Sequence, residues 1–233
     1  MRKKRSVLHW SGGKDCAYTL YILNQQSNIT VDRILVSLNG KNKISMHGVD
    51  KSLIECQAEM IGTPVEFVTL PENPSNKEYE ETLLAEMETC RNDGIEYAAF
   101  GDIFLTDVRK YRENLFRQAD FKTLFPLWGM NTRKLAEEFI DSGFKAKVVS
   151  VNGSKLDSSF AGRDYDHKFI DNLPKSTDSC GENGEFHTFV YDGPIFKEPL
   201  KIDVGNTIRK LIQSPSDPQE HIRFYYSGIS LKK

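Results

Sequence analysis

The sequence predicts an α/β protein whose parallel sheet is covered by helices on both faces, with a small, mostly β appendix at its C-terminal end. Three observations support this fold class. Short apolar runs alternate with helical patterns through the first 150 residues, a glycine turn follows the first apolar run, and the composition changes after residue 152. Because parallel strands need crossover connections, such alternation indicates a doubly wound parallel sheet.

Each expected strand is a short run rich in Ile, Leu and Val, and each expected helix carries apolar residues at helical spacing. The strands are expected at residues 6–10, 31–38, 65–70, 95–100 and 146–151, and the helices at 14–24, 50–61, 76–91, 107–119 and 132–142. Gly62 should end the second helix in a left-handed cap. The run at 146–151 is expected as the fifth strand of the parallel sheet.

The change in composition predicts two regions, an α/β domain over residues 1–151 and a second region over 152–233. Residues 152–183 hold many Gly, Ser, Asp and Asn with little periodicity, so we expect irregular structure that covers the functional site. Strand-like pieces follow at 186–191, 200–204 and 222–226. They predict a small antiparallel subdomain.

Charge and composition exclude several classes of protein. Lys and Arg total 31 against 33 Asp and Glu, a formal net charge of −2, whereas a general nucleic-acid binder usually shows a basic excess. No apolar run reaches the length of a membrane span, and no secretory signal is visible near the start. The four cysteines are scattered without a Cys-x-x-Cys pair, so free thiols in a reducing cytoplasm are expected.

A phosphate-binding loop is predicted at Ser11–Asp15, which reads Ser-Gly-Gly-Lys-Asp between the first strand and the first helix. Two glycines let backbone N–H groups approach an anion, the helix N-terminus adds partial positive charge, and Lys14 adds a full charge. The common P-loop pattern does not match, because Leu8 and Asp15 stand where it has Gly and Ser or Thr. Residues 1–151 are therefore expected to bind a nucleotide.

A second motif, Gly101-Asp102, follows the fourth expected strand directly. In open parallel sheets, ligands bind beyond the carboxyl ends of the strands, where the strand order reverses. If strands one and four flank that point, Asp102 faces the same crevice as the phosphate loop. Mg²⁺ is usually held by one or two carboxylates together with substrate phosphates. Asp102 is thus the predicted Mg²⁺ ligand, with a helix-cap or turn aspartate as the alternative.

A third cluster of polar groups lies in the glycine-rich segment at residues 180–189. It combines two carboxylates, an amide, an imidazole and a hydroxyl, contributed by Glu182, Glu185, Asn183, His187 and Thr188. Such a segment is suited to bind a polar substrate or a metal ion. A hairpin with solvated acidic residues is the alternative.

Together these motifs resemble the diphthine–ammonia ligase family of the N-type (PP-loop) ATP pyrophosphatases. Four segments carry the resemblance in the same order, Ser11–Asp15, Gly101–Ile103, Pro126–Trp128 and Gly181–Thr188. The resemblance implies an adenine-nucleotide α-hydrolase-like (HUP-type) fold and the use of ATP with Mg²⁺. It also implies amidation of the diphthine side chain of elongation factor 2 with ammonium, which releases AMP and pyrophosphate.

The resemblance assigns roles to residues of this sequence. The residues expected to bind ATP are Ser11, Gly12, Gly13, Lys14, Asp15, Gly101 and Asp102. The expected catalytic residues are Lys14, Asp15, Glu182, Glu185 and His187, and the expected acceptor-binding residues are Trp128, Gly181, Glu182, Asn183, Gly184, Glu185 and Thr188. The acceptor is either a protein side chain, such as diphthine, or a small carboxylate. A homodimer is compatible with the sequence.

Two other functions stay open at this point. Other PP-loop enzymes transfer sulfur to tRNA, and Cys16 or Cys180 would be the sulfur carrier; Cys16 also stands where the superfamily usually has Ser. A regulatory module that binds ATP or AMP without catalysis is the other alternative, since a fold does not determine a function. The acidic groups at 180–189 favour catalysis.

Overall fold

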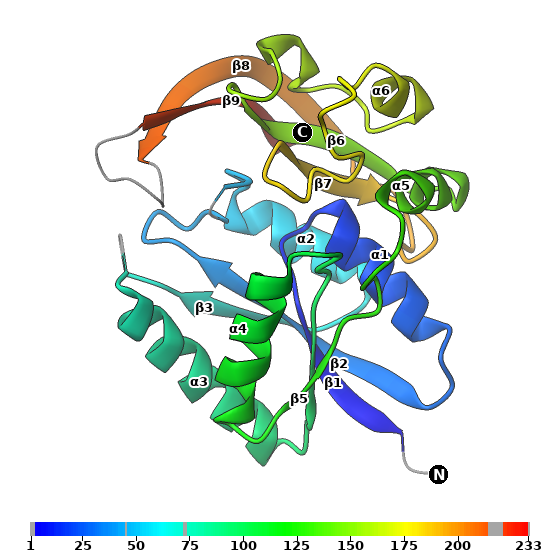
Figure 1. Ribbon diagram of the computed structural model, residues 1–233. Helices are drawn as coiled ribbons and strands as arrows, with labels where there is room; N and C mark the ends of the chain where they lie inside the picture. Colours follow the sequence, from blue (N-terminus) through cyan, green and yellow to red (C-terminus); the bar gives the residue numbers. More distant parts are fainter. Residues whose placement is uncertain (1–2, 45, 72–73, 214–220, 233) are drawn as a thin grey trace.

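Two β-sheets organise the computed structural model, which describes residues 3–44, 46–71, 74–213 and 221–232 (Figure 1). The first sheet has five strands in the order β3-β2-β1-β4-β5, all paired in parallel. The second has four antiparallel strands in the order β7-β6-β9-β8. The predicted fold class, a doubly wound parallel sheet followed by a mostly β part, is confirmed.

Crossover helices connect the parallel strands, as the alternating pattern predicts. The strands are β1 (Lys4–His9), β2 (Ile29–Leu38), β3 (Val65–Thr69), β4 (Tyr97–Ala99) and β5 (Lys122–Leu124). The helices between them are α1 (Lys14–Asn24), α2 (Lys51–Ile61), α3 (Asn76–Asn92) and α4 (Thr106–Arg117). In Figure 1, α1 and α2 lie between the two sheets, and α3 and α4 cover the opposite face of the parallel sheet.

The second sheet forms after α5 (Thr132–Asp141). Its strands are β6 (Lys145–Asn152), β7 (Phe186–Asp192), β8 (Ile202–Gln213) and β9 (His221–Leu231), and between β6 and β7 lie the 3₁₀ helix η1 (Ser158–Phe160) and the short helix α6 (His167–Asp171). The segment expected to be irregular thus contains two short helices. The strand expected at 200–204 overlaps the start of the longer β8, and the strand expected at 222–226 lies within the longer β9.

Two hydrophobic cores hold the layers together. In the larger core, Leu20 of α1 and Ile54 of α2 belong to the same cluster as Phe189 of β7, so this core joins the parallel sheet to the second sheet. In the smaller core, Met87 of α3 and Phe116 of α4 cover the other face of the parallel sheet. A parallel sheet buried on both faces explains why its strands read as nearly continuous apolar runs.

One strand assignment from the sequence is wrong. The run at 146–151 forms β6, which pairs with β7 and β9 in the antiparallel sheet, and the fifth parallel strand is β5 at Lys122–Leu124. A buried apolar run looks the same in a parallel sheet and in the centre of a covered antiparallel sheet. The three residues of β5, Lys-Thr-Leu, include a single apolar residue and therefore form no apolar run. The division of the chain at residue 151 stays a prediction.

Helix ends follow local sequence signals. Gly62, with a φ of +75°, ends α2 in the left-handed conformation that the sequence predicts. Ser75 and Glu78 form a capping box at the start of α3, in which each side chain accepts the backbone N–H of the other residue.

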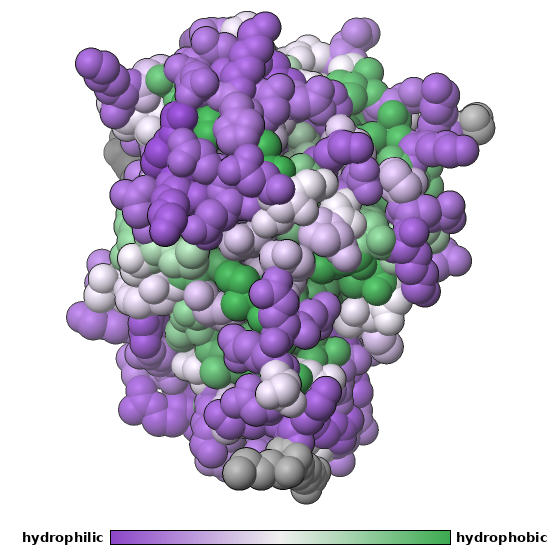
Figure 2. All heavy atoms as spheres, turned by 90° about the vertical axis from the view of Figure 1, so that its right-hand side faces the viewer, coloured by the Kyte–Doolittle hydropathy of each residue, from purple (hydrophilic) through white to green (hydrophobic). Residues whose placement is uncertain are grey.

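No helix among the described residues is both long and apolar enough to cross a membrane. On the face seen in Figure 2, hydrophobic and neutral residues form a band between more hydrophilic upper and lower parts.

Candidate active site

A cleft of about 520 Å³ opens beyond the carboxyl ends of β1, β2 and β4. It lies where the strand order reverses, because β1 pairs with β2 on one side and with β4 on the other. Open α/β sheets bind ligands at this position. The side chains and backbone that line it include Trp10, Ser11, Asp15, Gly101, Asp102, Glu182 and His187.

The loop after β1 turns sharply into helix α1. Gly12 has a φ of +79°, and a Cβ atom at this position would lie 2.7 Å from Cδ1 of Ile54. Glycine is therefore required here both by the backbone conformation and by the closeness of α2. Gly13 is the N-cap of α1, so the positive end of the helix dipole lies at the loop. This is the geometry of an anion-binding turn.

Lys14, the first residue of α1, is buried, with 4% of its surface exposed. Its Nζ atom lies 2.8 Å from each carboxylate oxygen of Asp15 and 5.7 Å from the ring centre of Tyr165. Burial alone would lower the pKa of Lys14, but the charge of Asp15 and the hydrogen bonds to it raise that pKa above its ordinary value. The side chain therefore keeps its positive charge inside the protein.

A smaller cavity of about 130 Å³ adjoins the phosphate loop. Gly13 and Lys14 line it from one side, and the segment that leads into β7 lines it from the other. We call it the chamber and the larger cavity the cleft. Four residues line both cavities, and we call them the junction: Asp15, His47, Glu182 and His187.

The loop before β7 is held by its own polar groups. The carboxylate of Asp178 accepts the backbone N–H groups of Cys180 at 3.0 Å and of Glu182 at 3.1 Å. Glu185 is 1% exposed and accepts the backbone N–H of Asp178 and the side-chain amide of Asn183, both at 3.2 Å. Glu185 thus supports the loop and lines neither cavity. Its predicted catalytic role stays a prediction.

Glu182 and His187 bring two titratable groups to the junction. Glu182 accepts the backbone N–H of Ile103 at 2.8 Å. Burial raises the pKa of Glu182 to about 7, although the hydrogen bond from Ile103 opposes this shift. Burial, together with the neighbouring His47 and Lys14, lowers the pKa of His187 well below its ordinary value. A carboxyl group whose pKa is raised to about 7 thus lines the same two cavities as a neutral imidazole, a combination typical of functional sites.

Buried hydrogen bonds join the phosphate loop to β7. The Oγ1 atom of Thr188 accepts the first backbone N–H of helix α1 at 3.0 Å. Gln57 on α2 is fully buried. Its amide donates to the carbonyl oxygens of Gly12 at 3.1 Å and of Val190 at 2.7 Å, and its Oε1 accepts the indole N–H of Trp10 at 2.7 Å. Gln57 therefore fixes both halves of the site to one helix.

Gly101 and Asp102 continue the end of β4 into the cleft. A Cβ atom on Gly101 would lie 2.9 Å from the backbone carbonyl carbon of Asp15, so glycine allows this close approach to α1. The carboxylate of Asp102 lies 2.8 Å from Nε of Arg112. Burial raises the pKa of Asp102, and the charge of Arg112 opposes that shift.

The predicted Mg²⁺ site has no preformed ligand set in the described part of the chain. No group of three or more His, Cys, Asp or Glu side chains is placed there to hold a metal ion. Asp102 already has a counter-ion in Arg112. The residues present therefore do not fit a Mg²⁺ ion held by the protein alone. Asp102 as a ligand, together with ATP phosphates, stays a prediction.

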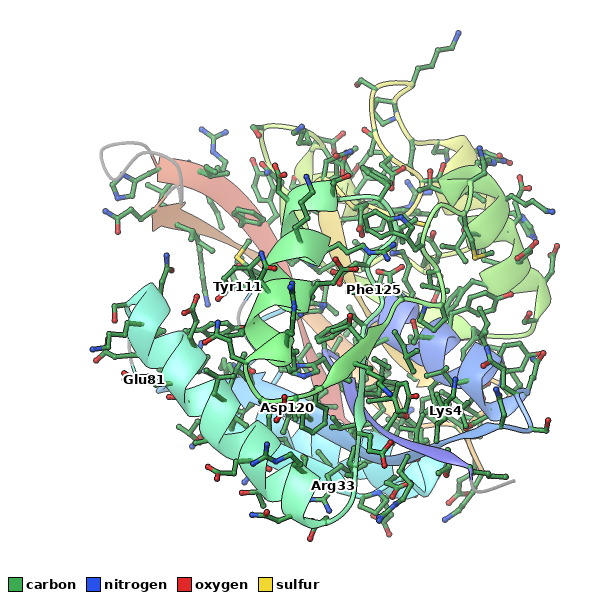
Figure 3. All side chains as sticks on the ribbon, turned by 60° about the horizontal axis from the view of Figure 1, so that its bottom comes forward. Lys4, Arg33, Glu81, Tyr111, Asp120 and Phe125 are labelled. Atoms are coloured by element: carbon green, nitrogen blue, oxygen red, sulfur yellow. The ribbon has the colours of Figure 1, made fainter. Side chains whose placement is uncertain are left out.

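Trp128 lies outside both cavities. The guanidinium of Arg109 on α4 lies 4.6 Å from its ring centre and 4.9 Å from that of Phe125. Figure 3 shows this side of the molecule, with Phe125 beside α4 and Tyr111 on that helix. The expected contact of Trp128 with the acceptor stays a prediction.

The structure brings most of the predicted residues to the two cavities. Ser11, Gly101 and Asp102 line the cleft, Gly13, Lys14, Gly181, Gly184 and Thr188 line the chamber, and Asp15, Glu182 and His187 line both. Gly12, Trp128, Asn183 and Glu185 line neither. Residues more than 160 positions apart along the chain thus meet in one site, as the motifs predict.

Four residues near the site are missing from the sequence prediction. His47 and Gln57 contact or support the phosphate loop, and Arg112 pairs with Asp102. His9 forms part of the cleft wall and stacks on Phe100 with 4.5 Å between ring centres, and burial with the charge of Arg112 lowers its pKa to about 3. Gln57 did leave a signal, because it is a polar residue on the apolar side of a predicted helix.

Comparison with known proteins gives similarity over most of the chain. The family models described as the diphthamide synthase N-terminal domain and the diphthamide synthase C-terminal domain match residues 4–123 and 131–214. A Bos taurus protein named diphthine–ammonia ligase is 25% identical over 224 residues, which cover 85% of this chain and 82% of that protein. The first family model alone spans more than half of the chain.

Other proteins with the same name align over different shares of their length. The Homo sapiens protein is 30% identical over 110 residues, which cover 45% of this chain and 41% of that protein. The Schizosaccharomyces pombe protein is 26% identical over 209 residues, which cover 82% of this chain and 34% of that protein. In the last alignment most of this chain therefore matches about a third of a longer protein.

Proposed function

The chain belongs to the diphthamide synthase family, and on that premise we propose that it is an ATP-dependent ligase of the diphthine–ammonia ligase type. It cleaves ATP between the α- and β-phosphates, adenylates a carboxylate on an acceptor, and converts that carboxylate to an amide with ammonium. AMP and pyrophosphate are the other products. The names of the relatives support the type of reaction, and the site supports the chemistry.

The observation that carries this proposal is the pair of cavities that meet at the phosphate loop. The cleft of about 520 Å³ has room for an adenosine group and the reacting end of an acceptor. The chamber of about 130 Å³ has the size of a small anion and is lined by Lys14 and the start of α1. ATP bound across the junction would have its α-phosphate between the two cavities. Such an arrangement favours cleavage between the α- and β-phosphates.

The chemistry then proceeds in two steps. A carboxylate oxygen of the acceptor attacks the α-phosphorus, and the bond to the β-phosphate oxygen breaks. Pyrophosphate leaves into the chamber, where the ammonium group of Lys14 and the N-terminus of α1 stabilise its charge. Ammonia then attacks the acyl carbon, and AMP departs with the oxygen that came from the carboxylate. Ammonium gives up one proton before the attack and a second one as the amide forms.

A Mg²⁺ ion that enters with ATP would neutralise charge on the phosphates. Because Arg112 already neutralises Asp102, binding of the ion by Asp102 would require that ion pair to open or to be shared. The acceptor is a protein side chain, such as diphthine of elongation factor 2, or a small carboxylate. The names of the relatives favour diphthine.

The two thiols near the site do not favour sulfur transfer. Burial raises the pKa of Cys16, and it raises the pKa of Cys180 to about 12. Cys180 donates its S–H to the carbonyl oxygen of Thr132 at 3.3 Å, and Cys16 donates to that of Gly13 at 3.0 Å. Sulfur carriers react as thiolates, so these buried and protonated thiols are poorly suited to that role.

Product analysis tests the proposal. The purified chain would be incubated with ATP, Mg²⁺ and ammonium, either with elongation factor 2 that carries diphthine or with small carboxylates. We expect AMP and pyrophosphate, lost in Lys14→Ala. The matched control is Lys77→Ala, because Lys77 is an exposed lysine on α3. Formation of ADP and phosphate would refute the proposal, and tight ATP binding without turnover would favour a regulatory module.

A further inference from the structure

Glu182 is a carboxylate at the junction that lacks a partner of opposite charge. One of its oxygens accepts the backbone N–H of Ile103 at 2.8 Å. None of the Lys and Arg side chains in the described ranges lies within ion-pair distance of it. Asp15 and Asp102, which carry the same sign of charge, act on it together with Lys14. A partly buried carboxylate with no counter-ion of its own is a place where a small cation binds favourably.

His187 adds an acceptor of a different kind to the same wall. Its Nε2 atom is covered and has no hydrogen-bond partner. Its ring centre lies 4.6 Å from that of His47, which comes from the loop between β2 and α2. In the neutral ring with its proton on Nδ1, Nε2 accepts a hydrogen bond. A covered polar atom without a partner is unfavourable unless a ligand satisfies it.

This set of acceptors distinguishes between small cations. Mg²⁺ prefers oxygen ligands in octahedral geometry. Ammonium carries four N–H donors and is satisfied equally well by a carboxylate oxygen and an imidazole nitrogen. Glu182 and His187 offer one of each beside the point where the α-phosphate of ATP would lie, so a nucleophile bound to them is next to the acyl carbon that it must attack.

Resting on the proposed function, we propose that Glu182 and His187 bind the ammonium ion that serves as the nucleophile. Glu182 accepts one proton from ammonium, which leaves ammonia with a free electron pair. That pair forms the C–N bond as the bond from the acyl carbon to the AMP oxygen breaks. The second proton leaves the nitrogen and goes to the departing phosphate. Glu185 supports the loop from a buried position outside both cavities.

Crystals of the full chain soaked in a thallium(I) salt test the binding site without any turnover. Tl⁺ is similar in size to ammonium and is located by its anomalous scattering. We expect a Tl⁺ peak beside the carboxylate of Glu182 that ammonium chloride displaces and that Glu182→Gln abolishes. Tl⁺ sites only elsewhere, or a site at Glu182 that takes Mn²⁺ in preference to Tl⁺, would overturn the proposal. This result does not depend on whether the acceptor is known.

Kinetics test the role of the site in the reaction. Glu182→Gln should raise the KM for ammonium by about tenfold or more, because hydrogen bonds to charged groups are the strong ones, and should leave the KM for ATP within about twofold. The exposed Glu198 provides the control variant Glu198→Gln. A wild-type chain that makes no AMP would refute the proposed function alone, since the Tl⁺ experiment still decides the site. A change in the KM for ATP with none for ammonium would overturn the present inference.

Two substitutions of His187 separate binding from packing. His187→Gln places a polar atom near the position of Nε2, and we expect a loss in ammonium affinity of only about threefold. His187→Leu fills similar space without an acceptor and should lose at least about tenfold. Equal effects of the two variants would mean that the ring only packs at the junction, and would remove His187 from the site.

Discussion

The two halves of the site are built in different ways. The loop at Ser11–Asp15 has its main determinants close together in the sequence, namely two glycines, the end of β1 and the start of α1. The loop before β7 is held together by its own polar groups, but contacts with distant parts of the chain place it at the site. Glu182 reaches the backbone of Ile103, and Thr188 reaches the start of α1. The first half is therefore a local motif, whereas the second exists as a site only in the complete fold.

Gln57 connects the two halves through its side chain. It forms hydrogen bonds to the first half through Gly12 and Trp10 and to the second half through Val190. Gln57→Leu would keep the volume but remove the Gln57 partner from the indole N–H of Trp10 and from the carbonyl oxygen of Val190, whereas the carbonyl oxygen of Gly12 would still accept the backbone N–H of Val190 at 2.9 Å. At about 1–3 kcal/mol for each of these two groups, partly offset by the apolar side chain, we expect a loss of about 2–4 kcal/mol in the free energy of unfolding. Urea denaturation measures it.

The control for this prediction is Gln26→Leu, because Gln26 is exposed in the turn after α1. That variant should change the free energy of unfolding by less than about 0.5 kcal/mol. A Gln57→Leu variant as stable as the control would show that water or a local shift satisfies the Trp10 and Val190 groups. The two halves would then not be coupled through α2.

Much of the first half was predictable from the sequence, because its determinants lie within a few residues. The glycines, the lysine and the strand–helix transition are all adjacent in Ser11–Asp15. In the second half the polar residues were visible at 180–189, but their roles were not. Glu185 and Glu182 look alike in the sequence, yet one supports the loop and the other lines both cavities. Burial and long-range contacts decide between them, and a single sequence records neither.

The prediction of the fold from the sequence was limited in the same way. Four of the five parallel strands and their helices were predicted because each lies in an apolar run or a helical pattern of sufficient length; β4 has only three residues, but it lies within the expected strand at 95–100. β5 has three residues and shows no pattern, and β6 was assigned to the wrong sheet because pairing partners are not encoded in an apolar run. His47 escaped notice for a similar reason, since it lies in a loop without a motif and approaches Gly13 only in the folded chain.

A pair of glycines, one in each half, tests how closely each half of the site is packed. Gly12 and Gly184 have φ values of +79° and +76°, but a Cβ atom would meet Ile54 at 2.7 Å on Gly12 and nothing within 4 Å on Gly184. Gly12→Ala should lower the free energy of unfolding by about 2–3 kcal/mol, because strain and overpacking add. Gly184→Ala should lower it by about 1 kcal/mol, from strain alone. Thermal unfolding of both variants measures the difference. Equal losses would mean that Ile54 of α2 moves away from the added methyl group at little cost in free energy.

Thr188 provides a smaller test of the contact between the halves. Thr188→Val is nearly isosteric and removes the Oγ1 atom that accepts the first N–H of α1 at 3.0 Å. We expect a loss of about 1–1.5 kcal/mol in the free energy of unfolding, with a higher KM for ATP because the start of α1 is less firmly held. Thr89→Val on the exposed side of α3 is the matched control. If both variants behave like the wild type, the bond between Thr188 and α1 contributes nothing to stability.

The smallest expected effect is a gain in the free energy of unfolding when Glu182 is replaced by Gln, and this gain depends on pH. Burial raises the pKa of this carboxyl group from its ordinary value of 4.5 to about 7 in the folded chain. Below pH 4.5 the group is protonated in both the folded and the unfolded state. Between these two values the unfolded chain ionises while the folded chain does not, so the stability contribution of the neutral carboxyl falls as pH rises and is lost above about pH 7.

Glu182→Gln stays neutral at every pH and escapes this loss. The difference in free energy of unfolding between the variant and the wild type should therefore be near zero at pH 4, grow through the range between the two pKa values, and level off above pH 7. Its size should be about 1 kcal/mol after solvent screening of a partly exposed group. Urea denaturation at pH 4, 6 and 8 measures it, with Glu198→Gln as the control. If the variant is more stable and has lost its affinity for ammonium, the second half of the site carries a carboxylate that ammonium binding requires and that lowers the stability of the fold. A difference that does not change with pH would mean that Glu182 has the same pKa in the folded and the unfolded chain.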